Sequence, residues 1–172
     1  DYSGSSVSFN EDATIMAIGA TYADGSGGWN SGHVRVYQFS NDSWTQLGAD
    51  IDGEAASDYS GQSVSLSSDG NTIAIGAYAN DGNGSSSGHV RVYNYNGTTW
   101  NKLGSDIDGE AANDQSGYSV SLSSDGTTVA IGAPNNYGVS TNSGHVRVYS
   151  IVKTNNIPVA SNVSAATLQN VD

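Results

Sequence analysis

Apolar and polar residues alternate along most of this chain, in short runs separated by segments rich in Gly, Asn, Asp and Ser. Alternation with a period of two is typical of β-strands in a sheet, whereas a helix repeats its apolar positions every three to four residues. The pattern therefore predicts an all-β protein.

The pattern is repeated three times. The segment DYSGSSVSF begins at Asp1, returns as DYSGQSVSL at Asp58 and returns again as DQSGYSVSL at Asp114. The segments IGA and SGHVRVY also recur once in each copy, which gives a repeat of about 56 residues. Such repeats bury their apolar surface against neighbouring copies.

Each complete copy contains four candidate strands. They cover residues 5–9, 14–20, 33–39 and 44–51 in copy one, and 62–66, 72–77, 89–95 and 100–107 in copy two. In copy three they cover residues 118–122, 128–133 and 145–151. A tight SSDG turn follows the first strand in copies two and three, with Gly at the positive-φ position. Copy one has residues 10–13 (NEDA) there, so we expect its turn to differ.

The two faces of each predicted sheet differ in bulk. Ile73 and Ile75 point to one side of the second strand, while Ala74 and Gly76 point to the other. Stacking the sheets would place the bulky face of one on the small-residue face of the next. Four antiparallel strands per repeat favour the blades of a β-propeller over the coils of a solenoid.

This interpretation divides the chain into four parts. Blade 1 covers residues 1–57, blade 2 covers 58–113 and blade 3 covers 114–153, where the fourth strand is missing. Residues 154–172 resemble a linker and the start of an Ig- or cadherin-like domain. We therefore expect either self-association or the rest of a larger parent chain to complete the ring.

Composition and charge narrow the possible partners. The chain has a net charge of −12 and only five basic residues, so it should repel nucleic acid and anionic lipid. It has no Cys, which excludes disulfides and thiolate metal sites, and no apolar run long enough to insert in a membrane.

Histidine and arginine recur at fixed positions of the third strand, and tryptophan at the start of the fourth. A residue repeated in every blade is expected to be structural, and an arginine so placed should pair with a repeated carboxylate. The residues assigned to structure are His33, Arg35, His89, Arg91, His145, Arg147, Trp44 and Trp100.

The most divergent segments are the loops between the second and third strands, at one rim of the predicted ring. Variable loops on a rigid scaffold are where binding specificity is usually found. Their aromatic and amide or carboxylate side chains would suit a protein or glycan ligand, although drift in unconstrained loops is an equally simple explanation. The candidate ligand-binding residues are Tyr22, Asp24, Trp29, Tyr78, Asp81, Asn83, Asn135, Asn136 and Tyr137.

The third copy, SGYSVSLSSDGTTVAIGAPNNYGVSTNSGHVRVY, resembles the FG-GAP repeat of integrin α-subunit propellers and of bacterial and algal surface proteins. The GAP element is literal at residues 132–134, and the FG element is represented by Ser-Gly at Gly4, Gly61 and Gly117. The resemblance implies an extracellular or cell-surface propeller used in adhesion or recognition.

Many repeats of that family bind calcium in the first hairpin, but here the hairpin at residues 67–72 has a single acid, Asp69. One carboxylate falls short of the six to eight oxygen ligands that Ca²⁺ takes. We therefore expect no cofactor and no metal, because the usual calcium loop is absent; a cation such as calcium, held with the help of Asp24 and Asp81, is the weaker alternative. A non-catalytic recognition module is the first hypothesis, a purely structural spacer the second, and a polysaccharide-active enzyme the third.

Overall fold

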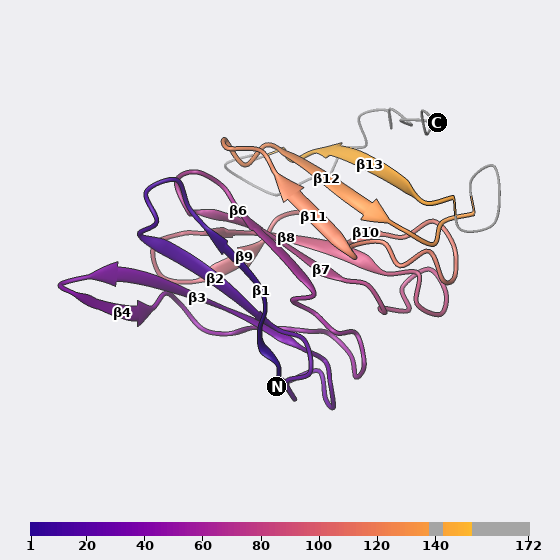
Figure 1. The fold of residues 1–172 in the computed structure, drawn as a ribbon, viewed down its shortest axis with the longest axis horizontal. Helices are drawn as coiled ribbons and strands as arrows, with labels where there is room; N and C mark the ends of the chain where they lie inside the picture. The colour runs from indigo at the N-terminus through magenta and orange to yellow at the C-terminus, as the bar shows by residue number, and fades with distance from the viewer. Residues whose placement is uncertain (138–142, 153–172) are drawn as a thin grey trace.

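The computed structural model describes residues 1–137 and 143–152, which form three antiparallel β-sheets arranged one after another (Figure 1). The predicted all-β class is therefore confirmed, and the sheets are those expected of consecutive propeller blades. No helix among the described residues is long and apolar enough to cross a membrane. The expectation for residues 154–172 lies outside the described residues.

The sheets follow the repeats. Sheet 1 contains β1 (Ser3–Phe9), β2 (Ile15–Ala20), β3 (His33–Ser40), β4 (Ser43–Gln46) and β5 (Ile51–Asp52). Sheet 2 contains β6 (Ser63–Leu66), β7 (Thr72–Ala77), β8 (His89–Tyr95), β9 (Trp100–Lys102) and β10 (Ile107–Asp108). Sheet 3 contains β11 (Ser119–Leu122), β12 (Thr128–Ala133) and β13 (His145–Ser150). Each sheet runs in sequence order from its first to its third strand.

The predicted fourth strand is interrupted, which corrects the expectation of one strand over residues 44–51. Both β4 and β5 pair with β3, with Gln46 opposite Tyr37 and Ile51 opposite Val34. Four residues of the fourth strand therefore face only two of β3, and Gly48 takes a positive φ of 78° within this bulge. Bulges re-aim side chains, and this one holds Asp50 against β3.

The first hairpin of copy one keeps the turn of the other copies, so the expectation of a different turn is wrong. Ala13 N–H donates to the carbonyl of Asn10, as Gly70 N–H donates to that of Ser67. Ala13 has a φ of 54° where Gly70 has 70°. The exposed alanine thus accepts a left-handed conformation that favours glycine.

The apolar core lies between the sheets rather than within any one of them. One cluster joins Val34 and Val36 of sheet 1 to Ile73 and Ile75 of sheet 2. A second cluster joins Val90 and Val92 of sheet 2 to the bulky residues of sheet 3, Leu122, Val129 and Ile131. Ala17 and Ala74 of the second strands also belong to these clusters, so the bulky face of each sheet packs on the face of the preceding sheet that carries the small residues of its second strand, as predicted.

Glycine permits the closest approach between sheets. A Cβ on Gly76 would fall on the backbone carbonyl of Gly117 in sheet 3, and a Cβ on Gly19 would fall on that of Gly61 in sheet 2. Neither Gly19 nor Gly76 has a positive φ, so the requirement for glycine is one of space.

Serines of the first strands form hydrogen bonds from one sheet to the next. Ser6 Oγ donates to the carbonyl of Gly61 at 2.7 Å, and Ser63 Oγ to that of Gly117 at 2.8 Å. Ser8 Oγ accepts from Leu66 N–H, and Ser65 Oγ accepts from Leu122 N–H. The alternating serines therefore join first strands of neighbouring sheets.

Replacing Gly76 with alanine should destabilise the protein by about 3 kcal/mol or more, at the upper end of usual overpacking costs, because a backbone carbonyl cannot rotate away. The matched control is Gly132→Ala. A Cβ on Gly132 meets only the side chain and backbone of Ser119 in its own sheet, and the Ser119 hydroxyl can rotate. Chemical denaturation should show a much larger loss of unfolding free energy for Gly76→Ala; equal losses would contradict the packing scheme.

Candidate functional site

Five tyrosines form a continuous aromatic row at one end of the three sheets. Successive ring centroids lie 4.7, 5.1, 5.5 and 5.8 Å apart. Tyr2, Tyr22 and Tyr118 are 74%, 43% and 48% exposed, and the other two are half-buried. The members of this tyrosine row, in order, are Tyr2, Tyr22, Tyr59, Tyr78 and Tyr118.

Four members of the row come from two kinds of position. Tyr2 and Tyr59 stand just before the first strands, where both have positive φ values of 50° and 55°. Tyr22 and Tyr78 follow the second strands, which end beside the starts of the first strands. Burial among its neighbours raises the pKa of the Tyr78 hydroxyl above its ordinary value.

Sequence reasoning selected Tyr22 and Tyr78 but missed Tyr2, Tyr59 and Tyr118. The repeated Asp-Tyr pair at the start of copies one and two was the available signal for two of them. Tyr118 has no tyrosine counterpart in the other copies, so its place in the row follows only from the stacking of sheet 3.

Several of the predicted rim-loop residues shape their own loops. Asp24 accepts a hydrogen bond from Asn30 N–H at 2.9 Å, and Asp81 accepts one from Ser86 N–H at 2.8 Å. Asn83 donates to the Gly109 carbonyl at 2.9 Å. These side chains hold the loops beside the row.

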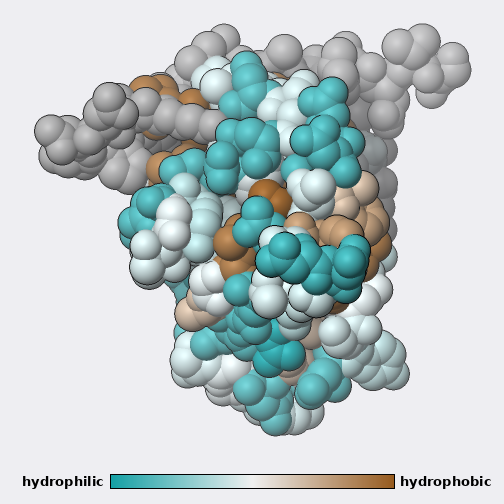
Figure 2. All heavy atoms as spheres, turned by 90° about the vertical axis from the view of Figure 1, so that its left-hand side faces the viewer, coloured by the Kyte–Doolittle hydropathy of each residue, from teal (hydrophilic) through white to brown (hydrophobic). Residues whose placement is uncertain are grey.

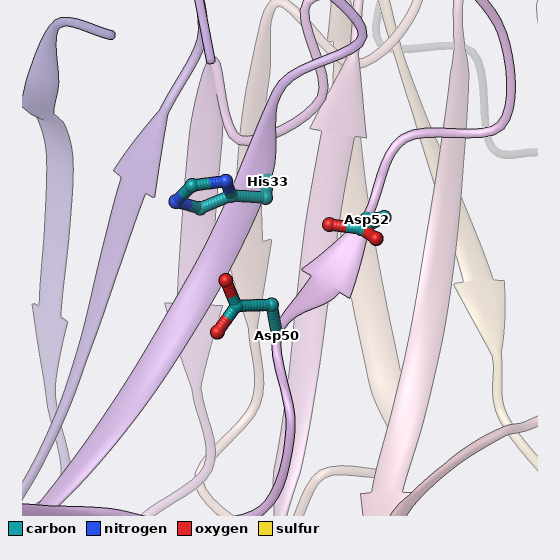
Figure 3. Close-up of side chains that lie close together, drawn as sticks. All are labelled: His33, Asp50 and Asp52. Atoms are coloured by element: carbon teal, nitrogen blue, oxygen red, sulfur yellow. The ribbon is translucent and has the colours of Figure 1, made fainter. Parts of the chain in front are cut away.

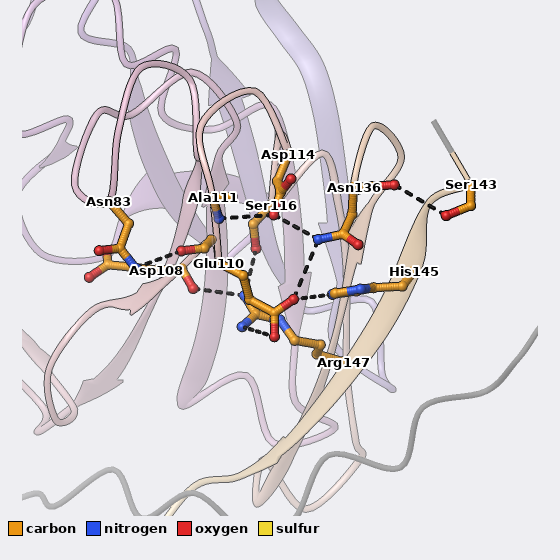
Figure 4. Close-up of polar contacts among 11 residues, drawn as sticks. Asn83, Asp108, Glu110, Ala111, Asp114, Ser116, Asn136, Ser143, His145 and Arg147 are labelled. Carbon is orange, nitrogen blue, oxygen red and sulfur yellow. Dashed lines mark hydrogen bonds and ion pairs between the residues drawn. The ribbon is translucent and has the colours of Figure 1, made fainter. Parts of the chain in front are cut away.

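The two asparagines of the third loop are tied to the preceding connection. Asn136 is buried and donates to Asp114 at 2.7 Å (Figure 4). Asn135 donates to the side chain of Gln115 at 2.8 Å. The amide of Asn136 is thus already used within the structure and does not belong to the exposed loop surface. Trp29 and Tyr137 remain exposed, at 67% and 60%.

Arginines of the third strands reach back to the preceding sheet. Arg91 is buried, and its guanidinium lies 3.2 Å from Glu54 and donates to the Asp52 carbonyl at 2.7 Å. Arg147 repeats both contacts, with Glu110 at 3.6 Å and the Asp108 carbonyl at 2.7 Å (Figure 4). The repeated acid is therefore supplied by the connection between sheets, here called the strap (residues 52–60 and 108–116).

Among the described residues no strap of another sheet reaches Arg35, which pairs within its own sheet instead. Its guanidinium lies 2.9 Å from Asp50, and 42% of the side chain is exposed. The hydrogen bond from Arg35 lowers the pKa of the Asp50 carboxyl, despite the opposing effect of partial burial. The arginine at this position thus joins neighbouring sheets in copies two and three, where its contact with the strap is here called the latch. In copy one it forms a surface ion pair.

The histidines at the start of the third strands lie among carboxylates. His33 on β3, Asp52 on β5 and Asp50 just before β5 bring one ligand atom each within 4.8 Å of one another (Figure 3). Glu54, His89 and Asp106 form a similar group. Nitrogen and carboxylate oxygen are donors that divalent transition metals accept.

Cations of the protein already pair with three of these four carboxylates, and the fourth, Asp52, accepts a hydrogen bond from Ser26 N–H. Arg35 pairs with Asp50, Arg91 pairs with Glu54, and Lys102 lies 2.8 Å from Asp106 and 3.7 Å from Glu54. A metal ion would have to compete with a guanidinium or ammonium at each group. We therefore interpret both groups as ion-pair networks around buried imidazoles.

The two repeated tryptophans occupy equivalent positions in different surroundings. Trp100 packs against the core between sheets 1 and 2, and its indole N–H donates to the Leu47 carbonyl of sheet 1 at 2.8 Å. Trp44 is 40% exposed, and its aromatic neighbours, Phe9 and Phe39, belong to its own sheet. The difference arises because no sheet precedes sheet 1 among the described residues.

The latch can be tested with Arg91→Met. Loss of the buried guanidinium should cost roughly 1.5–3 kcal/mol, the range for hydrogen bonds to charged groups, since the abandoned Glu54 is partly solvated. Arg35→Met is the matched control and should cost only about 0–1 kcal/mol, as exposed pairs do. Thermal melting of both variants measures the difference, and a reversed order would refute the latch.

Stability should fall as the pH drops below about 6.5, the ordinary pKa of histidine. Burial, followed by the charge of Arg91, lowers the pKa of His89 in the folded protein, while Asp106, Glu54 and Asp58 oppose this. The unfolded chain therefore binds the proton first, so this contribution is present above pH 6.5 and is lost below it. The fall in Tm between pH 7.5 and 5.5 should shrink in His89→Gln; an unchanged fall would exclude His89 as its source.

Comparison with known proteins agrees with this architecture. The FG-GAP repeat model matches residues 49–93 and 106–149, which together make up just over half of the chain. No match was found among curated proteins. Each matched range begins near the end of one sheet, includes the strap and ends in the third strand of the next sheet, so it contains both Glu54 and Arg91, or both Glu110 and Arg147. With its repeated sheets, straps and latches, the chain belongs to the FG-GAP repeat family.

Proposed function

We propose that this chain is a non-catalytic, extracellular recognition module that binds a neutral glycan along the tyrosine row and the adjoining rim loops. The observation that carries the proposal is the row itself, an exposed aromatic surface built from all three sheets. FG-GAP repeats are typical of extracellular and cell-surface proteins and of propellers without catalytic activity, which supports this setting.

An exposed row of tyrosines suits a sugar chain chemically. Each tyrosine combines an apolar ring with a hydroxyl that can donate and accept hydrogen bonds. The row runs across the sheets, so a ligand following it would be extended. Trp29 and Tyr137, on the loops of the first and third sheets, add exposed aromatic surface.

The surroundings of the row are ordered rather than loose. Tyr59 N–H and Ser60 N–H donate to the carbonyls of Asn30 and Ser31, which fastens the strap to the first rim loop. Tyr59 is also held at a φ of 55°, a backbone conformation that is unusual for a bulky residue. A surface prearranged in this way loses little conformational entropy on binding.

Charge favours a neutral ligand over an acidic one. With a net charge of −12, the chain should repel sulfated or uronic-acid glycans. In the described His and carboxylate groups, Asp50, Glu54 and Asp106 are paired with Arg or Lys, which supports binding over acid–base catalysis.

Binding to a panel of neutral polysaccharides and oligosaccharides, measured by calorimetry and by glycan array, tests the proposal. Tyr59→Ser and Tyr78→Ser should each weaken binding about two- to tenfold, since aromatic stacking contacts are worth about 0.5–1.5 kcal/mol. Phe39→Ser is the control, because Phe39 is a 42% exposed aromatic at the opposite end of the sheet.

Three outcomes would contradict the proposal. Binding that survives both tyrosine substitutions would place the site elsewhere. Binding to a protein but to no glycan would change the ligand class, and binding to neither would favour a structural spacer. Turnover of a polysaccharide by the purified protein would replace recognition with catalysis.

A further inference from the structure

Sheet 1 exposes a bulky face whose equivalents are buried in the rest of the molecule. Val7 and Phe9 of β1 are 59% and 50% exposed, whereas Val64 and Leu66 at the same positions of β6 are 8% and 7% exposed. Viewed from the side of β4, this end of the molecule shows hydrophobic residues among hydrophilic ones (Figure 2). The exposed side of sheet 1 that carries Val7 and Phe9 is here called the head face.

Sheet 3 exposes the opposite kind of face at the other end. Val146 of β13 is 41% exposed, whereas Val90 at the same position of β8 is fully buried. The Cβ position of Gly132 meets only Ser119 of its own sheet, whereas that of Gly76 meets the neighbouring sheet. This small-residue surface is here called the tail face.

The tail face also carries the hydroxyls that join sheets elsewhere. Ser63 and Ser65 of sheet 2 bond to Gly117 and Leu122 of sheet 3, and their counterparts Ser119 and Ser121 are exposed. The head face carries the matching backbone groups. In sheet 2 the Gly61 carbonyl accepts a hydrogen bond from Ser6, and the Leu66 N–H donates one to Ser8. Gly4 and Phe9 occupy the equivalent positions in sheet 1.

The two faces therefore correspond, at the positions compared, to the two sides of a packing that the molecule already uses twice. We propose that a second copy of this chain covers each face, with the head face of one copy seated on the tail face of the next. The contact would continue the established packing between sheets 1 and 2 and between sheets 2 and 3. It joins two different surfaces, so it forms a ring if the rotation closes and a longer chain if it does not.

The charge of the protein opposes this association and makes it sensitive to salt. Each copy carries a net charge of −12, and the repulsion between two copies is screened as ionic strength rises. The apolar contact is unaffected by that screening. Association should therefore become stronger between low and moderate salt, the reverse of an interface held by ion pairs.

Sedimentation velocity over a range of protein and salt concentrations tests the proposal. The parent protein should form dimers or larger species, while Val7→Glu and Val146→Glu should each reduce self-association to the level of a monomer. Both residues are exposed in the single copy, so neither change should lower its Tm. Asn101→Glu, an exposed site on β9, controls for the added charge and should associate like the parent.

Mixing the two face variants distinguishes this arrangement from others. Val7→Glu keeps an intact tail face and Val146→Glu an intact head face, so an equimolar mixture should recover a one-to-one dimer and nothing larger. A mixture that stays monomeric while the parent associates would indicate a different interface. A parent that stays monomeric under all conditions would overturn the proposal, leaving these faces to another protein or to further repeats of a longer chain.

Discussion

The distance at which neighbouring sheets pack depends on one position in the second strand, where Gly19 and Gly76 have no side chain. A Cβ at either position would overlap a backbone carbonyl of the next sheet, so glycine allows the first strands to approach closely. That approach brings serine hydroxyls within hydrogen-bond distance of the next strand, as at Ser63, and lets isoleucines such as Ile73 fill the space behind it. The apolar clusters, the arginine latches and the tyrosine row all require this spacing.

The strap fixes the backbone along the rim because it is bonded both to the rim loop of its own sheet and to the next sheet. It follows the rim loop of its own sheet, with Gly32 and Ser60 paired as an isolated parallel bridge, and it presents Glu54 to Arg91 of the next sheet. Because the strap is held at both places, Tyr59 is fixed between Tyr22 and Tyr78. The family unit, which starts before the strap and ends in the third strand, therefore corresponds to a junction between sheets rather than to one sheet. This explains why the arginine contacts recur only where a preceding sheet is present.

The candidate binding surface and the candidate self-association surfaces follow from the same geometry but are separate. The row lies at the ends of the strands, where rings from successive sheets meet. The head and tail faces lie on the flat sides of sheets 1 and 3 and reproduce what sheet 2 presents to its neighbours. A ligand on the row would therefore leave both faces free. Association of copies would add further rim loops beside the first, which is a route to binding an extended ligand at several points.

The sequence by itself determined the repeat, the strand class, the choice of bulky and small faces, and the need of Arg91 for a carboxylate, because period-two patterning and recurrence are local properties. It did not determine the break in the fourth strand, which depends on pairing of both β4 and β5 with β3. It also could not select Glu54 from the several repeated acids, because that partner comes from a different sheet. The tyrosine row is likewise a product of tertiary structure: Tyr59 and Tyr118 stand at unrelated places in their repeats, and only the stacking of the sheets brings both beside Tyr78.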